Sequence, residues 1–340
     1  MRALFGGGSR ATHFRDVPDP VISSGIEAIV KPLAVAVCDL DIAYLLGLLP
    51  TAQPYAFGHE FTAEVVAIGD SVNNVKVGNI VTVPFQISCG SCTRCRTTRS
   101  LDCTTVPPLS TYGLEPFGGG VAWGGACADL ALVPFADAMC VSLPAGVDSL
   151  HAASVSDNVA DGYRTVAPYV RPGDEVLVIG SASVGLYAVA TAKALGIPVT
   201  YVDDDPVRLA VAQRLGATII ESAPGGQSYG SFPVVAAAVS TPTGLMSALA
   251  SVEPGGVVHS SGIQFFGASE VDYLDMYRRG VQLVTGRASA RDDIPAILAL
   301  MAQGRLDPTI VTGNVVHVDD TPGRLEHQLT HKTIINMGAR

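Results

Sequence analysis

The chain has 340 residues, 48% of them hydrophobic, which is enough for two domains with separate cores. Its formal net charge is −10 and it contains no basic run, which argues against nucleic-acid and anionic-membrane partners. The N-terminus lacks an apolar signal segment, and the longest uncharged stretch, 176–192, is too short to span a membrane. We therefore expect a soluble, cytoplasmic protein.

The first part of the chain, up to about residue 150, has the pattern of β-strands separated by glycine and asparagine turns. Segments 61–69 (FTAEVVAIG) and 79–85 (NIVTVPF) have the strand pattern. Segment 127–144 adds a further alternating strand and ends in a turn at Pro144. Glycine-rich loops join these pieces, and the pattern predicts an irregular antiparallel barrel.

Four of the seven cysteines lie in one short polar loop with the spacing C-x2-C-x2-C-x7-C. Disulfides are disfavoured because cytoplasmic thiols stay reduced and because an odd number cannot pair completely. Four thiolates could also hold an iron–sulfur cluster. A compact loop is most typical of a closed tetrahedral zinc site, in which the metal replaces a core. The predicted ligands are Cys89, Cys92, Cys95 and Cys103.

From about residue 174 the pattern changes to strands separated by helices. The short apolar run 174–180 is followed by a helical segment at 184–196, a strand at 198–203 and a helix at 206–217. A further helical segment, GLMSALASVEPGG, occupies 244–256. This alternation predicts right-handed βαβ units and a parallel sheet. The tail begins with an amphipathic helix near Asp293 and ends in strand-like segments.

A degenerate dinucleotide fingerprint, Gly180-x-Ala182-x-x-Gly185, follows the first of these strands and opens a helix. Asp203 ends the next strand, where a carboxylate can bind the ribose hydroxyls. Two more aspartates follow, so a 2′-phosphate would be repelled and NAD should be preferred over NADP. We expect Arg208 to help hold the ribose. The simpler alternative is a helix N-terminus followed by an acidic turn.

A second metal site is indicated by Cys38, by His59 in the GHE sequence and by Asp157. A lone cysteine is usually a buried apolar residue, so each of these residues carries little weight alone. Together, thiolate, imidazole and carboxylate provide three ligands with a fourth position open, as in catalytic zinc sites.

With GHE, the Cys38 spacing, the four-cysteine lobe and the glycine-rich turn in this order, the chain resembles the zinc-dependent medium-chain alcohol dehydrogenases. The resemblance covers nearly the whole length and implies an α/β protein. A GroES-like β-barrel catalytic domain would comprise 1–150 and 286–340, with a structural-zinc lobe at about 86–106. A Rossmann doubly wound NAD-binding domain would comprise 151–285.

The resemblance also implies roles for individual residues. Cys38, His59 and Asp157 match the catalytic-zinc ligands, and the four lobe cysteines match the structural-zinc ligands, giving two zinc ions per subunit. Glu60 matches a carboxylate that can approach the metal, and Asp41 matches the residue that orients the histidine ligand. The implied cofactor-binding residues are Gly180, Ala182, Val184, Gly185, Asp203, Arg208 and Ile263.

One position departs from the family pattern. Leu40 stands where the family usually has a serine or threonine that carries the alcohol proton away. Bound water, a cofactor ribose hydroxyl or another side chain would have to replace it. Asp161 is a candidate, since the family often has threonine at that position beside the nicotinamide.

The implied activity is reversible hydride transfer between NAD and a hydrophobic alcohol, secondary or cyclic. The apolar preference rests on residues that could line a pocket, namely Leu46, Leu48, Leu49, Tyr55, Phe57, Phe117 and Trp123. The alternatives are a polyol or sugar dehydrogenase of the same family and a non-catalytic NAD-binding zinc protein. A zinc-free quinone or enoyl reductase is disfavoured because such proteins lack both metal sets. The resemblance also implies a homodimer or homotetramer.

Overall fold

The computed structural model describes residues 1–7, 12–49, 51, 54–114, 121–180, 182–265, 267–322, 325 and 332–338. The chain divides into two compact units. Unit 1 comprises Met1–Ala160, Ser289–Ala302 and Thr312–Arg340, and unit 2 comprises Asp161–Ala288 and Gln303–Val311. Among the described residues, no helix has the length and apolarity needed to cross a membrane.

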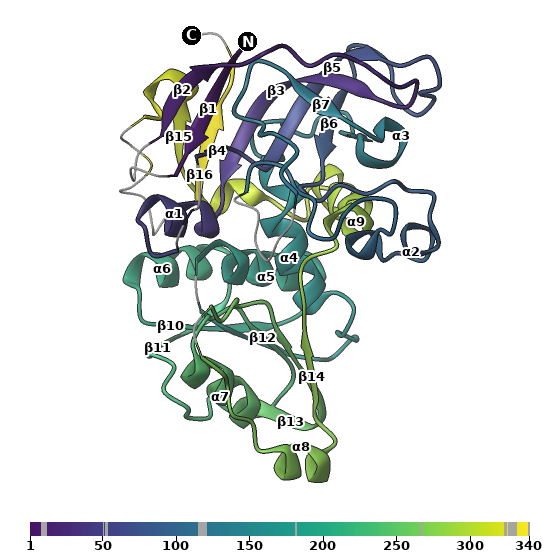
Figure 1. Ribbon diagram of the computed structural model, residues 1–340. Helices are drawn as coiled ribbons and strands as arrows, with labels where there is room; N and C mark the ends of the chain where they lie inside the picture. Colours follow the sequence, from purple (N-terminus) through teal and green to yellow (C-terminus); the bar gives the residue numbers. More distant parts are fainter. Residues whose placement is uncertain are drawn as a thin grey trace. The chain divides into compact units, whose positions relative to one another are not determined.

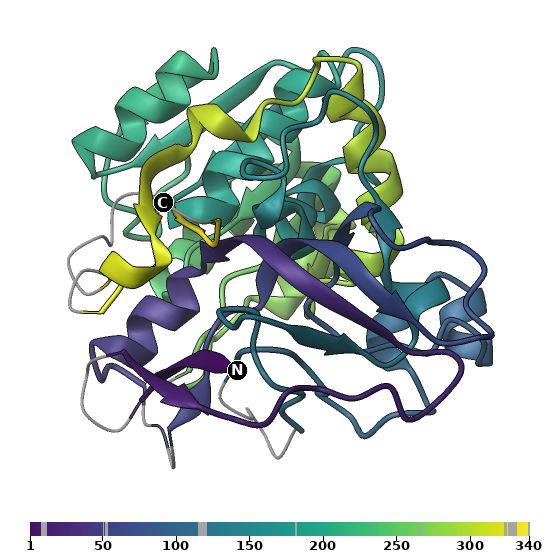
Figure 2. The same cartoon turned by 90° about the horizontal axis from the view of Figure 1, so that it is seen from above.

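Unit 1 is built mainly of β-strands. Its larger sheet has the order β15-β16-β3-β5-β6-β8, with β7 also paired to β3. Neighbouring strands pair antiparallel, as the sequence pattern predicts, except for the parallel pair β15 and β16. The long strands β3 and β5 lie side by side (Figures 1 and 2). The strands are β3 (Ala28–Val37), β5 (Glu60–Ile68), β6 (Ile80–Val83), β7 (Ala131–Val133), β8 (Val141–Ser142), β15 (Thr312–His317) and β16 (Lys332–Asn336).

Shorter elements complete unit 1. A three-stranded antiparallel sheet has the order β2-β1-β4. Its strands are β1 (Arg2–Gly6), β2 (His13–Asp16) and β4 (Tyr55–Ala56). The helices are α1 (Asp39–Leu45), α2 (Thr93–Arg96), α3 (Ala136–Met139) and α9 (Ala290–Ala302), and 3-10 turns occur at Ser100–Asp102, Ala153–Ser156 and Val318–Asp320. Helix α4 (Asn158–Val166) begins in unit 1 and continues into unit 2.

Unit 2 contains a six-stranded sheet of order β11-β10-β9-β12-β13-β14 among the described residues. All neighbouring strands are parallel, and the order reverses between β9 and β12, as in a doubly wound nucleotide-binding sheet. Figure 1 shows α5 and α6 on one side of this sheet and α7 on the other. The strands are β9 (Val176–Ile179), β10 (Val199–Asp203), β11 (Thr218–Glu221), β12 (Phe232–Ala237), β13 (Val252–Ser260) and β14 (Gln282–Thr285); the helices are α5 (Ala182–Ala194), α6 (Pro206–Arg214), α7 (Pro242–Ser251) and α8 (Tyr273–Arg279), with a 3-10 turn at Pro308–Ile310.

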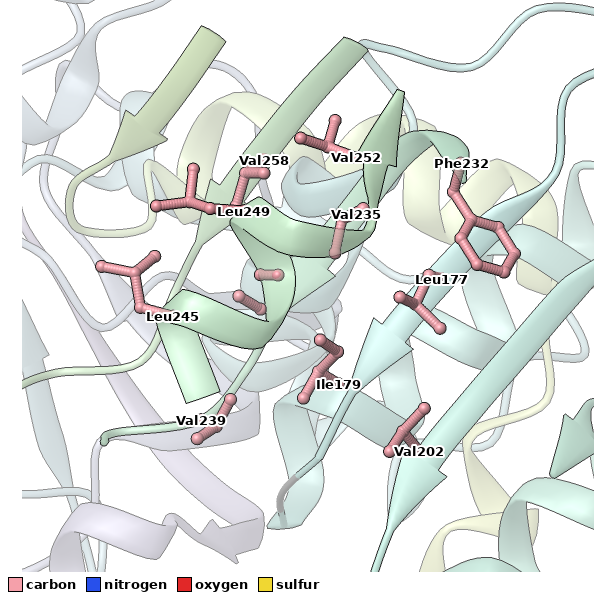
Figure 3. Close-up of a cluster of buried hydrophobic side chains, with 12 residues drawn as sticks. Leu177, Ile179, Val202, Phe232, Val235, Val239, Leu245, Leu249, Val252 and Val258 are labelled. Carbon is pink, nitrogen blue, oxygen red and sulfur yellow. The ribbon is translucent and has the colours of Figure 1, made fainter. Parts of the chain in front are cut away.

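One hydrophobic cluster of unit 2 lies between the sheet and α7 (Figure 3). Leu245 and Leu249 of α7 join a cluster that includes Leu177 of β9, Val235 of β12 and Val258 of β13. Leu177, Val235 and Val258 are completely buried. Full burial of a leucine or valine stabilises a fold by about 1.5–3 kcal/mol, so this cluster holds α7 against strands β9, β12 and β13.

The predicted end of the helix that corresponds to α7 is wrong. The segment 244–256 has a helical pattern, but α7 ends at Ser251 and β13 begins at Val252. Pro254 cannot donate a backbone hydrogen bond within a helix, and Gly255 has a φ of +80°, which a helix does not allow. The chain therefore turns directly from helix to strand.

Candidate metal and cofactor sites

Cys38 and His59 are both placed by local chain geometry. Cys38 directly precedes α1, and its backbone N–H donates to Asp41 Oδ2 at 3.0 Å. His59 directly precedes β5 and follows Gly58, which has a φ of +95°. A Cβ at Gly58 would lie 2.9 Å from the backbone nitrogen of Cys127, so only glycine fits this turn. The GHE sequence therefore turns the histidine inward.

Four candidate ligands from separate segments converge in unit 1. Ligand atoms of Cys38, His59, Glu60 and Asp157 all lie within 4.8 Å of one another, and all four residues are buried. His59 Nε2 is 3.2 Å from Asp157 Oδ2, and His59 Nδ1 is 3.5 Å from an oxygen of Asp41. Ligands of a tetrahedral zinc ion are about 3.3–3.7 Å apart, so a small shift would bring them to bonding distance.

The electrostatics of this cluster fit a cation. Burial raises the pKa of the Cys38 thiol to about 12, and the neighbouring Asp157 adds to the shift. A thiol in this position would therefore stay protonated at neutral pH, whereas a coordinated metal ion deprotonates a thiol outright. The set of sulfur, imidazole and carboxylate donors suits zinc.

Two residues beside this cluster have no counterpart in the sequence prediction. Lys332, at the start of β16, donates to both carboxylate oxygens of Glu60 at 2.7 and 2.9 Å. It also donates to Asn158 Oδ1 at 2.6 Å. The Asn158 side-chain nitrogen in turn lies 3.3 Å from Cys38 Sγ and 3.2 Å from Asp157 Oδ2. The sequence signal for Lys332 is weak, because β16 (KTIIN) also contains Thr333 and Asn336 and the burial of the lysine is visible only in the structure.

The four lobe cysteines also come together. Their sulfur atoms lie within 4.8 Å of one another. Cys89 Sγ accepts hydrogen bonds from Thr105 Oγ1 at 3.1 Å and from the backbone nitrogen of Cys92 at 3.3 Å. The pKa of the Cys92 thiol is lowered to about 5 by hydrogen bonds from the backbone of Cys95 and from Thr104. Donors that stabilise thiolates around four converging sulfurs fit a closed tetrahedral metal site.

The glycine turn of unit 2 has the close packing that a dinucleotide site requires. A Cβ at Gly185 would lie 2.8 Å from the carbonyl oxygen of Gly180, so a larger residue would push α5 away from β9. Ala182 is the first residue of α5. A cofactor pyrophosphate fits at such a strand-to-helix turn because the free N–H groups of the helix N-terminus attract anions.

Asp203 lies at the end of β10, as predicted, and is paired with Arg208 in α6. Arg208 Nε and one terminal nitrogen contact the two carboxylate oxygens at 2.7 and 2.6 Å, and the Tyr201 hydroxyl donates at 2.6 Å. Burial alone would raise the pKa of Asp203, but the hydrogen bonds from Arg208 and Tyr201 lower it. Asp203 therefore stays ionised at neutral pH.

The remaining residues singled out in the sequence, Val184, Ile263, Asp161 and Leu40, differ in burial and in their contacts. Val184 is partly buried in α5, and Ile263, 45% exposed, follows β13. Asp161 in α4 accepts a hydrogen bond from Arg164 Nε at 2.5 Å. Leu40 lies in α1 and is partly buried.

Comparison with known proteins agrees with this geometry. Residues 24–145 match the alcohol dehydrogenase GroES-like domain, and residues 183–303 match the zinc-binding dehydrogenase domain. A Mycobacterium tuberculosis protein named "Probable zinc-binding alcohol dehydrogenase Rv1895" is 32% identical over 90% of this chain and 80% of its own length. The chain belongs to the zinc-dependent medium-chain alcohol dehydrogenase family. It is thus an oxidoreductase of this family, and the predicted fold class is confirmed.

Other members of the family are also similar. Glutathione-independent formaldehyde dehydrogenase from Pseudomonas aeruginosa is 35% identical over 57% of this chain, but this match covers only half of its own length. Sorbitol dehydrogenase from Bacillus subtilis is 25% identical over 98% of this chain and 94% of its own. Among solved structures, the alcohol dehydrogenase TADH from Thermus sp. ATN1 has a TM-score of 0.90 and 28% identity, with 99% of each chain covered.

Proposed function

We propose that this chain catalyses reversible hydride transfer between an alcohol and NAD. The supporting observation is the convergence of Cys38, His59, Glu60 and Asp157 within 4.8 Å in a buried position. Cys38, His59 and Asp157 would hold one zinc ion, and Cys89, Cys92, Cys95 and Cys103 would hold a second. In this proposal the GroES-like domain comprises 1–150 and 286–340, and the cofactor domain comprises 151–285.

The bound zinc ion would supply Lewis acidity toward the oxygen of an alcohol or ketone. The surrounding residues fix the ligand geometry. Asp41 Oδ1 lies 3.5 Å from His59 Nδ1, so its negative charge favours a proton on Nδ1 and leaves Nε2 facing the other ligands. The ring of Phe85 makes an edge contact with the imidazole of His59, with ring centroids 5.9 Å apart, and both residues are buried.

The second zinc ion has a structural part in this proposal. The lobe 86–106 contains α2 and one 3-10 turn, and it is tied to the rest of unit 1 where Ser100 donates to Asp292 at 3.0 Å. So short a segment cannot build a core, and a metal ion would replace it.

We expect NAD to be preferred over NADP, and replacing Asp203 tests this. In Asp203→Ser the ribose hydroxyls lose a charged acceptor, so kcat/KM for NAD should fall about 10–100-fold, because hydrogen bonds to charged groups contribute about 1.5–3 kcal/mol. The freed Arg208 would favour a 2′-phosphate, so the NADP to NAD ratio should rise. Initial rates with both cofactors measure the change. A wild-type enzyme that already turns over faster with NADP would overturn the assignment of Asp203.

We propose a hydrophobic secondary or cyclic alcohol as substrate. Of the apolar residues considered from the sequence, Tyr55 and Phe57 are buried with ring centroids 6.4 Å apart, Leu48 is 62% exposed, and Phe117 lies outside the described residues. Support for the apolar preference therefore comes mainly from Phe85 beside His59. The full-length similarity to sorbitol dehydrogenase makes a polyol the second candidate.

A substrate panel with a chelation arm tests the activity. We expect NADH formation with cyclic and secondary alcohols, weaker rates with sorbitol, and loss of turnover after chelation with recovery on zinc addition. Rates confined to polyols would favour the second candidate. NAD binding without turnover on any alcohol, with metal present, would instead indicate a non-catalytic protein.

We also propose a cytoplasmic homodimer or homotetramer, in keeping with the family resemblance. Analytical ultracentrifugation of the full chain would give the oligomeric state, and a monomer at micromolar concentration would contradict it.

A further inference from the structure

Asn158 and Lys332 lie against the candidate zinc ligands, although neither belongs to the ligand set. Asn158 opens α4 and is 2% exposed, and Lys332 opens β16 and is 3% exposed. Buried lysines and amides are costly unless every polar group is paired. Both side chains meet this condition through one another and through Glu60, Cys38 and Asp157.

The direction of each hydrogen bond follows from the chemistry of the groups. A lysine ammonium can only donate, so the Asn158 atom 2.6 Å from Lys332 Nζ must be the amide oxygen. The amide nitrogen must then face Cys38 Sγ at 3.3 Å and Asp157 Oδ2 at 3.2 Å, where it donates to both. Lys332 thus determines which end of the Asn158 amide meets the metal ligands.

The same lysine controls Glu60. Its two hydrogen bonds to the Glu60 carboxylate, at 2.7 and 2.9 Å, occupy both oxygens and neutralise a third negative charge beside Cys38 and Asp157. Glu60 also has an oxygen within 4.8 Å of the other candidate ligand atoms, so this pairing with Lys332 competes with any direct contact between Glu60 and a cation.

We propose that Lys332 and Asn158 act as a positioning pair for the zinc site, an inference that rests on the proposed function. Lys332 orients the amide, and the amide N–H groups hold the thiolate of Cys38 and the carboxylate of Asp157 side by side. The hydrogen bond to Sγ also draws electron density from the sulfur, so the sulfur donates less to the cation and the cation remains a stronger Lewis acid.

Cobalt-substituted protein tests this pair, because the thiolate-to-cobalt charge-transfer band reports on the sulfur directly. The band of the Cys38 site is the difference between wild-type and Cys38→Ser spectra, which removes the contribution of the four-cysteine lobe. In Asn158→Leu, a variant of similar size without a donor, we expect the band to move to longer wavelength. Cobalt and zinc affinity at this site should fall about 10–100-fold, the usual effect of losing a ligand's outer partner.

A second pair of variants tests the part of the lysine. Lys332→Arg keeps a cation that can donate to Glu60 and Asn158, so the band should stay near its wild-type position. In Lys332→Met the amide is released, and the band should move as in Asn158→Leu. Because this change leaves Glu60 unpaired, the double variant Lys332→Met/Glu60→Gln is measured beside it, with retained lobe metal and an unchanged circular dichroism spectrum as the requirement for folding.

The outcomes separate this inference from the proposed function. A wild-type band that depends on Cys38 but does not move in Asn158→Leu, with metal affinity unchanged, would overturn the positioning pair alone. A lower cobalt occupancy of the Cys38 site with an unmoved band would also overturn it, because nonspecific destabilisation of the protein gives that result. A wild-type protein without any Cys38-dependent band would overturn the proposed zinc site and the inference together.

Discussion

Replacing His59 with alanine is expected to lower kcat/KM for alcohol oxidation by about 10³–10⁴-fold, because Lewis-acid activation contributes several kcal/mol to transition-state stabilisation. His59 supplies the only imidazole among the four clustered residues, and its loss leaves two or three anions without a complete ligand set. The same variant should lose one of two zinc equivalents. Steady-state kinetics and metal analysis on the same preparation measure both effects.

His151→Ala is the matched control. His151 is a partly exposed histidine of unit 1 that lies 3.6 Å from Asp148, outside the cluster of Cys38, Glu60 and Asp157. We expect activity within about twofold of wild type and unchanged zinc content, as for most surface substitutions. Equal losses in both variants would show that the effect of His59→Ala is not specific to the metal site.

Replacing Cys103 with alanine is expected to lower the melting temperature by about 10 °C or more. Losing a structural metal is among the most destabilising single changes, at 4–5 kcal/mol or above, and about 2–4 °C is lost per kcal/mol in a unit of this size. The thiol of Cys103 is buried in the lobe and accepts from the backbone nitrogen of Cys89 at 3.4 Å. Calorimetry with parallel zinc analysis measures the change.

Cys140→Ala is the control for this prediction, because Cys140 is also buried but lies outside both candidate metal sites. Its loss removes a small apolar group and should lower the melting temperature by only a few degrees. Retention of both zinc equivalents in Cys103→Ala, with a melting temperature like that of Cys140→Ala, would contradict a structural zinc site in the lobe.

The parts of the fold that follow from short-range patterns could be predicted from the sequence. Residues 174–217 alternate between apolar runs and helical periodicity, and the structure has β9, α5, β10 and α6 there. The end of α7 was missed because a helical pattern continues through Val252, although Pro254 and the positive φ of Gly255 exclude a continuing helix. Periodicity shows that a helix is present more reliably than where it ends.

Only part of the candidate metal site could be predicted from the sequence. Its ligands could be named because Cys38, His59 and Asp157 stand in family motifs. The residues that hydrogen-bond to this cluster could not be predicted. Lys332 is 272 residues from Glu60 in the chain, and the contact between them depends on how β16 pairs with β3. The pairing of Arg208 with Asp203 was predicted only as a general contribution to the ribose site. Side-chain hydrogen bonds between distant segments leave no periodic signal in a single sequence.

The most direct test of the central claim is the zinc content of purified wild-type protein, with the metal positions found by anomalous diffraction at the zinc edge. We predict two zinc ions per chain, one bound by Cys89, Cys92, Cys95 and Cys103 and one bound by Cys38, His59 and Asp157. A single zinc ion in the lobe of a fully active enzyme, with no anomalous peak beside His59, would contradict it.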